Sequence, residues 1–207
     1  LFKNGYFTQV LDANGRQVAQ YPVNNFARLP ITLVQDAAGE PLYVHLELPG
    51  RILFAHVWKM QVGRVTLYLM DTDTRRNTDE DRHITDRLYE ANREVRLLQE
   101  MVLGMGGMRL LRILNILPGV YHMNEGHSVF MALERLRDNM ASGMAFAEAL
   151  ERVRSNTLFT THTPVPAGHD AFPESMIRQY MSHYPDVLGI TWEQYINLGK
   201  TNPNDPN

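Results

Sequence analysis

The sequence predicts an α/β protein whose first portion is rich in antiparallel strands. Residues 5–70 form short alternating or β-branched runs joined by turn residues. Residues 84–200 instead alternate helical and strand-like segments, a pattern typical of parallel strands with helical crossovers. We therefore expect one folded portion over residues 1–200 and a loose, proline-broken polar tail over residues 201–207.

The strand-rich portion is expected to be an antiparallel meander. Asp12-Ala-Asn-Gly15 separates two strand-like runs, and Asn-Gly is a strong hairpin signal. Val44, Leu46 and Leu48 alternate with polar residues, which places them on one face of a strand. The expected strands are Tyr6–Leu11, Arg16–Tyr21, Ile31–Gln35, Tyr43–Leu48, Ile52–Gln61 and Val65–Met70.

A dense polar segment runs from Asp71 to His83. Its carboxylates are of the kind that bind calcium, but no Gly and no closing Glu stand at the positions that an EF-hand loop needs. We therefore expect a solvated, mobile loop that follows a strand.

Helical spacing of apolar residues dominates residues 92–116. Within this run, Gly104-Met-Gly-Gly107 lacks the last Gly of a dinucleotide-binding fingerprint, and no strand precedes it. We expect these glycines to let the helix pack closely against another backbone. The later elements expected are strands at Gly119–Met123 and Thr157–Thr161, and helices at Ser128–Met140, Met144–Arg154, Pro173–Ser182 and Thr191–Leu198.

Polar loops follow both of these later strands. In open α/β sheets, ligands bind outside the carboxyl ends of the strands, so we expect the functional site in these loops. Rigid donors and acceptors of this kind suit a sugar, whose hydroxyl groups need paired hydrogen bonds. The candidate residues are Asn124, Glu125, His127, His162, Thr163, His169 and Asp170.

Composition argues against several classes of protein. The net charge of −3 without a basic cluster does not suit nucleic-acid binding, and the absence of cysteine excludes disulfides and cysteine-ligated zinc. No apolar run reaches membrane-spanning length. We expect a cytoplasmic protein and, because both ends look cut, a fragment of a longer polypeptide.

Two kinds of catalysis are less well supported by the loops. The histidines and carboxylates lack the spacing of a zincin, so we expect no metal site. Gly126-His127-Ser128 lacks the second Gly of a nucleophile elbow, and nothing favours a serine triad. A metal-dependent hydrolase that uses His122, His127, His162 and His169 stays an alternative.

Several longer stretches stand in order along the chain. They are Leu67-Tyr-Leu-Met-Asp-Thr-Asp73, Asp81-Arg-His-Ile-Thr-Asp-Arg-Leu-Tyr89, Arg93-Glu-Val-Arg-Leu-Leu-Gln-Glu-Met-Val-Leu-Gly-Met-Gly-Gly107, His122-Met-Asn-Glu-Gly-His-Ser-Val-Phe130 and Phe159-Thr-Thr-His-Thr-Pro-Val-Pro-Ala-Gly-His-Asp-Ala-Phe172. Together they resemble the α-glucan (glycogen and maltodextrin) phosphorylases of the shorter bacterial type, and Gly5-Tyr-Phe-Thr-Gln9 resembles that family's segment upstream.

The resemblance implies a GT-B architecture, in which this chain is a portion of the amino-terminal Rossmann-like domain. It implies transfer of the terminal α-1,4-linked glucosyl unit of a glucan to orthophosphate, which yields glucose 1-phosphate. The implied cofactor is pyridoxal phosphate, whose lysine lies in a carboxyl-terminal domain outside this chain. The chain alone is therefore expected to lack turnover and to expose apolar surface that the missing domain would cover.

The resemblance also implies roles for individual residues. His162 would be the catalytic residue that meets the glucosyl unit, and Asn124, Glu125, His127 and Thr163 would bind substrate around it. Asn92 would bind substrate from a loop that gates the cleft, although the family has Asp after a Gly pair where this chain has Glu-Ala-Asn. The alternative is a glucan-binding module, or a degenerate relative, without catalysis.

Overall fold

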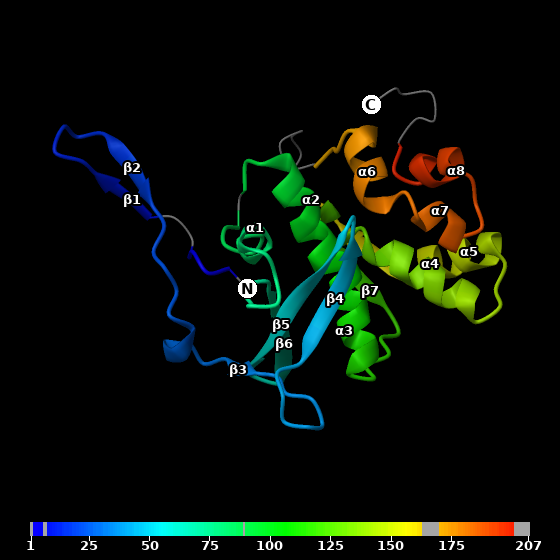
Figure 1. Ribbon diagram of the computed structural model, residues 1–207, viewed down its shortest axis with the longest axis horizontal. Coiled ribbons are helices and arrows are strands. Elements are labelled where there is room, and N and C mark those ends of the chain that lie inside the picture. The colour runs from blue at the N-terminus through cyan, green and yellow to red at the C-terminus, as the bar shows by residue number, and fades with distance from the viewer. Residues whose placement is uncertain (1, 6–7, 89, 163–169, 201–207) are drawn as a thin grey trace. The chain divides into compact units, whose positions relative to one another are not determined.

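The computed structural model shows a mixed α/β protein (Figure 1). Its residues divide into two compact units. The structure describes residues 2–5, 8–88, 90–162 and 170–200. The first unit comprises Leu1–Glu47 and Arg51–Gln99, and the second comprises Leu48–Gly50 and Glu100–Asn207. The proposed tail at 201–207 lies outside the described residues, as do Thr163 and His169. No helix in the described part is long and apolar enough to cross a bilayer.

Antiparallel strands are the main regular structure of the first unit, as the sequence predicts. A hairpin of two strands precedes a sheet of four, in which β5 pairs with each of the other three. The expectation of one continuous meander is wrong, because β3 pairs with β5 and not with its neighbour β4. The strands are β1 (Thr8–Leu11), β2 (Gln17–Gln20), β3 (Thr32–Leu33), β4 (Tyr43–Leu48), β5 (Arg51–Val62) and β6 (Val65–Asp71).

Local sequence explains where these strands turn. The Asp12 carboxylate accepts hydrogen bonds from the backbone N–H groups of Asn14 and Arg16, and Gly15 adopts a φ of +75° that the tight turn requires. Alternate residues of β4 are buried, including Val44 and Leu46, which confirms the predicted apolar face. Burial of this face stabilises the sheet by removing apolar surface from water.

The polar segment after β6 is not the solvated loop that its composition suggests. Thr72 and Asp81 are almost completely buried, and Asn77 exchanges two hydrogen bonds with the backbone of Phe54 in β5. The segment contains a short helix, α1 (Asp79–Arg82), whose first turn is capped by the Thr78 hydroxyl. The partners of these polar groups are distant in sequence, so the amino-acid composition of the loop alone does not predict that the groups are buried.

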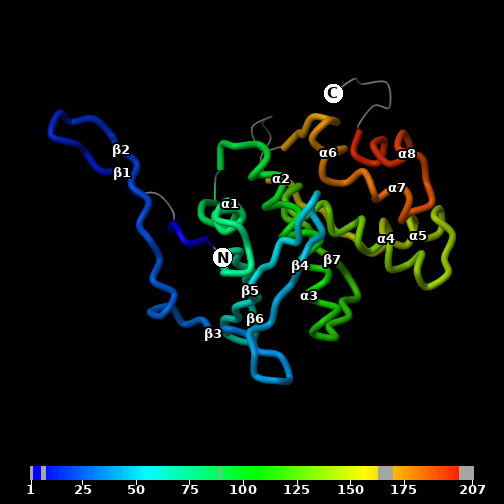
Figure 2. Tube along the Cα trace, in the orientation of Figure 1, coloured from blue at the N-terminus to red at the C-terminus, as the bar shows by residue number. Residues whose placement is uncertain are grey.

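Helices and one parallel strand pair form the second unit, again as predicted. The helical run begins in the first unit and continues through a π-helical segment, and β7 pairs in parallel with β8. The helices α4 and α5 lie between β7 and β8 in the sequence, and Figure 2 shows them side by side in space. The elements are α2 (Arg93–Met101), η2 (Val102–Gly106), α3 (Gly107–Ile113), β7 (Tyr121–Asn124), η3 (Gly126–Ser128), α4 (Met131–Ala141), α5 (Phe146–Ser155), β8 (Thr157–Thr160), α6 (Glu174–Met181), α7 (Tyr184–Val187) and α8 (Trp192–Asn197).

A buried carboxylate joins three helices of the second unit. Glu134 of α4 is fully buried and accepts hydrogen bonds from Arg109 of α3 at 3.0 Å and from the Tyr184 hydroxyl of α7 at 2.7 Å. Arg137 lies 2.5 Å from the same carboxylate. Burial, together with the Glu134 charge, raises the pKa of Tyr184 far above its ordinary value. The hydroxyl therefore stays protonated and remains a donor to Glu134.

Arg135 connects α4 to the start of β8. Its guanidinium donates to the Thr157 hydroxyl at 2.6 Å and to the Asn156 side chain, and it lies 3.8 Å from the centre of the Tyr121 ring. These contacts fix the amino ends of both strands of the parallel pair. The carboxyl ends of β7 and β8, where the candidate site residues lie, are thereby held in register.

Candidate active site

The carboxyl ends of β7 and β8 lie side by side. Tyr121 stands opposite Thr157, and Asn124 stands opposite Thr160, in a parallel register. The N–H of Glu125 donates to the Thr160 carbonyl at 2.8 Å, so the ladder extends to the last residue of both strands. The two polar loops expected from the sequence therefore start next to each other at one edge of the strand pair.

Glu125 connects the two loops through its side chain. Its carboxylate accepts a hydrogen bond from the backbone N–H of His162, and the residue is only 5% exposed. Its main chain has a φ of +58° and a ψ of −168°, a conformation that residues with a Cβ rarely adopt. The chain thus leaves β7 through a strained residue that also contacts the second loop.

The His162 ring is held by the residue before Glu125. Its Nε2 lies 2.7 Å from the Asn124 side-chain oxygen, and both residues are exposed. Because that oxygen can only accept, Nε2 is the donor in this contact, and Nδ1 faces away from Asn124 as the second ring nitrogen. Three of the predicted site residues, Asn124, Glu125 and His162, are therefore joined in one hydrogen-bonded group.

His127 lies between two carboxylates in the same unit. Its Nδ1 is 3.6 Å from the Glu100 Oε1 at the end of α2 and 3.6 Å from the Asp170 Oδ2 after the second loop. Both distances are longer than a good hydrogen bond. We expected a helix to begin at Ser128, directly after His127, but both residues lie in the 3₁₀ turn η3, and α4 begins later, at Met131.

Glu100, His127 and Asp170 could each offer one ligand atom to a metal ion. The three atoms lie within 4.8 Å of one another, and a histidine with two carboxylates is a ligand set that zinc accepts. The sequence did not predict this grouping. The four-histidine alternative gains no support, because His122 bonds to Thr160 and His162 bonds to Asn124.

A glycine brings the helical run against η3. A Cβ at Gly104 would lie 2.7 Å from the Met131 backbone nitrogen and 3.0 Å from the Ser128 carbonyl oxygen. The helix widens to a π-helix at this position, a deviation that often occurs near functional sites. The expected close approach of a helix to another backbone is confirmed for Gly104, and the backbone that it meets belongs to the turn carrying His127.

Two predicted substrate-binding residues are not part of this group. Thr163 lies outside the described residues. Asn92 lies in the first unit, where its side-chain oxygen accepts a hydrogen bond from the backbone N–H of Glu94 at 2.9 Å. Asn92 therefore caps the start of α2, which is a common role for Asn at a helix amino terminus.

Glu100 is not among the site residues predicted from the sequence. Its signal lies in the helical spacing, since Glu100 falls three residues after Leu97 and four before Gly104, on the face that the helix buries. A carboxylate on such a face needs a partner. His127, already a candidate from the polar loop, is the side chain that the structure places beside it.

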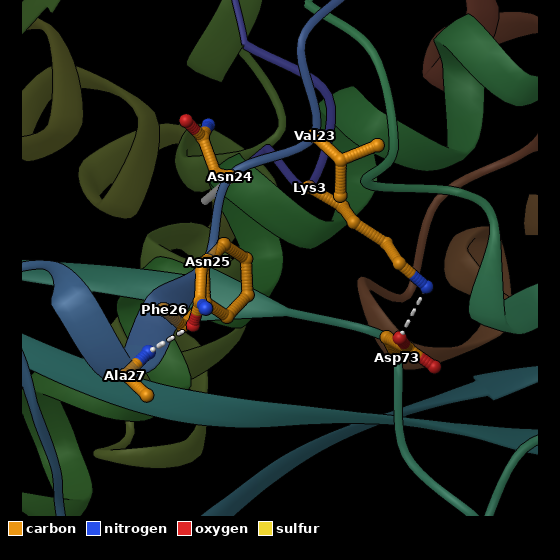
Figure 3. Close-up of a pocket in the computed structure, with 7 residues that line it drawn as sticks. All are labelled: Lys3, Val23, Asn24, Asn25, Phe26, Ala27 and Asp73. Carbon is orange, nitrogen blue, oxygen red and sulfur yellow. Dashed lines mark hydrogen bonds and ion pairs between the residues drawn. The ribbon is translucent and has the colours of Figure 1, made fainter.

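The first unit contains a pocket of about 450 Å³, which Figure 3 shows in close-up. The Lys3 side chain extends across it to Asp73, with Nζ 2.8 Å from the carboxylate. Asp73 also accepts a hydrogen bond from Arg82 at 2.8 Å, so its charge is paired. The lining residues are Lys3, Val23, Asn24, Asn25, Phe26, Ala27 and Asp73, and none of them is a residue that the sequence nominated.

Comparison with known proteins adds to this geometry, although no family model matches the chain. The chain is 44% identical to maltodextrin phosphorylase of Thermococcus litoralis over 200 residues, and this aligned segment covers 97% of the chain and 24% of that protein. It is 44% identical over 188 residues to glycogen phosphorylase of Mycobacterium tuberculosis, with 87% and 22% covered. With glycogen phosphorylase of Aquifex aeolicus, the identity is 34% over 206 residues, with 100% and 30% covered. The chain thus spans between a fifth and a third of the length of these relatives.

Proposed function

Since the chain is homologous to the glycogen and maltodextrin phosphorylases, we propose that it is part of an α-glucan phosphorylase. In this proposal, the chain contributes a portion of the amino-terminal domain of a GT-B enzyme that acts in the cytoplasm. The reaction transfers the terminal α-1,4-linked glucosyl unit of a glucan to orthophosphate and yields glucose 1-phosphate. The observation that carries the proposal is the hydrogen-bonded group of Asn124, Glu125 and His162 at the ends of β7 and β8.

His162 would contact the glucosyl unit. In the neutral tautomer with its proton on Nε2, directed at Asn124, the His162 Nδ1 accepts a hydrogen bond, and a sugar hydroxyl is a suitable donor. A carbonyl oxygen of the main chain beside it would stabilise the positive charge that develops at the anomeric carbon during transfer. His127, Thr163 and Asn92 would contribute further contacts to the glucan.

The cofactor implied by the resemblance does not fit the residues of this chain. Pyridoxal phosphate is held by a lysine Schiff base, and the lysines here are Lys3, Lys59 and Lys200. Lys3 pairs with Asp73, Lys59 is exposed on β5, and Lys200 follows α8. None stands on β7, on β8 or in the turns after them. The cofactor, its phosphate chemistry and the second wall of the cleft would come from the carboxyl-terminal domain, so the chain alone is expected to show no turnover.

The test is phosphorolysis of a maltooligosaccharide by the complete gene product, with pyridoxal phosphate supplied. We expect wild type to release glucose 1-phosphate and His162→Ala to lose turnover by about 100-fold or more, as when a transition-state contact is removed. His45→Ala is the matched control, because His45 is an exposed histidine of β4, and it is expected to retain wild-type turnover.

Two results would count against the proposal. Equal turnover by wild type and His162→Ala would remove His162 from the site. No glucose 1-phosphate from folded, cofactor-loaded wild type would refute phosphorolysis. In that case, retention of the protein on an immobilised glucan would favour the alternative, a module that binds glucan without catalysis.

A further inference from the structure

The hydrogen-bond ladder between β7 and β8 ends with a side-chain acceptor in place of a backbone carbonyl. The N–H groups of Tyr121 and Glu125 donate to the carbonyls of Asn156 and Thr160, at the two ends of the parallel register between the strands. A parallel ladder continued by one more step would pair the N–H of His162 with the carbonyl oxygen of Glu125. The structure instead pairs this N–H with the Glu125 side-chain carboxylate.

The backbone of Glu125 explains this exchange of acceptors. With φ at +58° and ψ at −168°, the chain departs from extended geometry at Glu125 and turns into η3. This conformation belongs almost only to glycine, and a glycine, Gly126, is the next residue. The strained position nevertheless carries a long acidic side chain, and that side chain is buried. Glycine would adopt this conformation without strain, so the presence of glutamate here indicates that its carboxylate has a role.

Consecutive residues of the first loop therefore hold His162 at two points. Glu125 binds its main-chain N–H, and Asn124 binds the Nε2 of its ring. The peptide position and the ring orientation of His162 are both set from the end of β7. His162 is exposed, so few packing contacts share this task.

We propose that Glu125 is a positioning residue, whose carboxylate replaces its own backbone carbonyl at the end of the ladder and holds His162 in place for glucosyl transfer. The proposal rests on the proposed function, in which His162 contacts the glucosyl unit. It differs from a direct role of Glu125 in substrate binding, because Glu125 acts through the main chain of His162. Reactions of this kind depend on placement, and a displacement of about 1 Å can lower a rate by about 100-fold.

The test compares three substitutions in the complete gene product. Glu125→Ala removes the carboxylate and keeps a Cβ at the strained position. Glu125→Gly also removes it but relieves the strain, so this variant folds even if the alanine variant does not. Glu125→Gln removes the charge and keeps an oxygen that accepts the His162 N–H. Glu148→Ala, at an exposed glutamate of α5, is the matched control.

Hydrogen exchange of the His162 amide, measured by mass spectrometry of overlapping peptides, reports the contact itself. We expect Glu125→Ala and Glu125→Gly to speed this exchange by about 10- to 100-fold, as expected for loss of a hydrogen bond to a charged acceptor. Both should lower kcat by about 10-fold or more, with KM for glucan changed by less than about 3-fold. Glu125→Gln should restore most of the protection and most of kcat, and Glu148→Ala should match wild type.

Unchanged exchange at His162 in both the alanine and the glycine variants would overturn the proposal. A raised KM with unchanged kcat would also overturn it, since that result is typical of a lost substrate contact. If wild type forms no glucose 1-phosphate, the proposed function fails, but the exchange measurement still decides whether the carboxylate holds His162. The two hypotheses are therefore tested separately.

Discussion

Two polar regions follow strand ends in this molecule, and they are built in opposite ways. After β6, in the first unit, Thr72 and Thr85 bond to each other, and Asp81 accepts two hydrogen bonds from Arg51. Thr72, Thr85 and Asp81 are buried, and their partners lie within the fold. After β7 and β8, in the second unit, a strained Glu125 holds an exposed His162.

The comparison shows that polar residues at a strand end do not by themselves mark a functional site. In the first region, the side chains satisfy backbone and side-chain groups nearby, which stabilises the fold and leaves their polar atoms engaged. In the second region, the fold accepts an unfavourable main-chain conformation and presents an imidazole at the surface. A strained backbone conformation next to an exposed imidazole is a better indication of function than polar residues at a strand end.

The largest change in stability that would test this comparison is expected from a substitution of Asp81. Asp81→Ala leaves the Arg51 guanidinium, which is 34% exposed, without its carboxylate partner at 2.7 Å. We expect the free energy of unfolding to fall by about 2 to 3 kcal/mol, because a hydrogen-bonded charge pair with one buried member is broken. Urea unfolding of the chain measures this change.

Asp79→Ala is the matched control for Asp81, since Asp79 lies in the same short helix with its side chain 91% exposed. It is expected to change stability by less than about 0.5 kcal/mol. Similar losses in both variants would mean that the segment after β6 is not held by the Arg51 contact. That result would remove the contrast between the two regions.

The next effect concerns the helix that supports η3. Gly104→Ala places a Cβ against the backbone at Met131 and Ser128, and backbone cannot move aside as a flexible side chain can. We expect a loss of about 1 to 3 kcal/mol in stability from this overpacking. Gly107→Ala, where a Cβ meets nothing within 4 Å, should instead stabilise the chain by about 0.5 to 1 kcal/mol, because alanine favours helix over glycine.

The opposite signs make this pair informative, since both substitutions lie in one helical run. Thermal unfolding of the two variants measures them under the same conditions. If both variants are more stable than wild type, Gly104 does not bring the helix against η3, and the support of the His127 turn must come from elsewhere.

The sequence predicted the order and type of the elements well, because periodicity and turn residues report local structure. Asn14-Gly15 marked the first hairpin, Thr191 caps α8, and the strand at Thr157–Thr160 runs parallel to β7 as expected. The pairing of β3 with β5 was missed because strand order depends on contacts that no local pattern encodes.

The candidate site was predicted in part, for the same reason. The strand-end rule brought Asn124, Glu125 and His162 together, and the structure joins them by hydrogen bonds. The strained backbone of Glu125 was not foreseen, because a glutamate carries no sequence signal for a positive φ. The neighbour of His127, Glu100, lies on another element, and only the folded chain shows that the two meet.

The smallest effect is a pH dependence at the pocket of the first unit. Burial alone would raise the pKa of Asp73, but hydrogen bonds and charge from Lys3 and Arg82 outweigh it and lower that pKa below its ordinary value of 3.8. A lowered pKa in the folded state means that the pairing stabilises the protein above that ordinary value and is lost as the pH falls through the folded pKa. We expect Asp73→Asn to cost about 0.5 to 1 kcal/mol at neutral pH, since its partners are partly exposed. The difference from wild type in urea unfolding should shrink towards zero at acid pH. A difference that stays constant with pH would show that Asp73 contributes through packing alone and not through its charge.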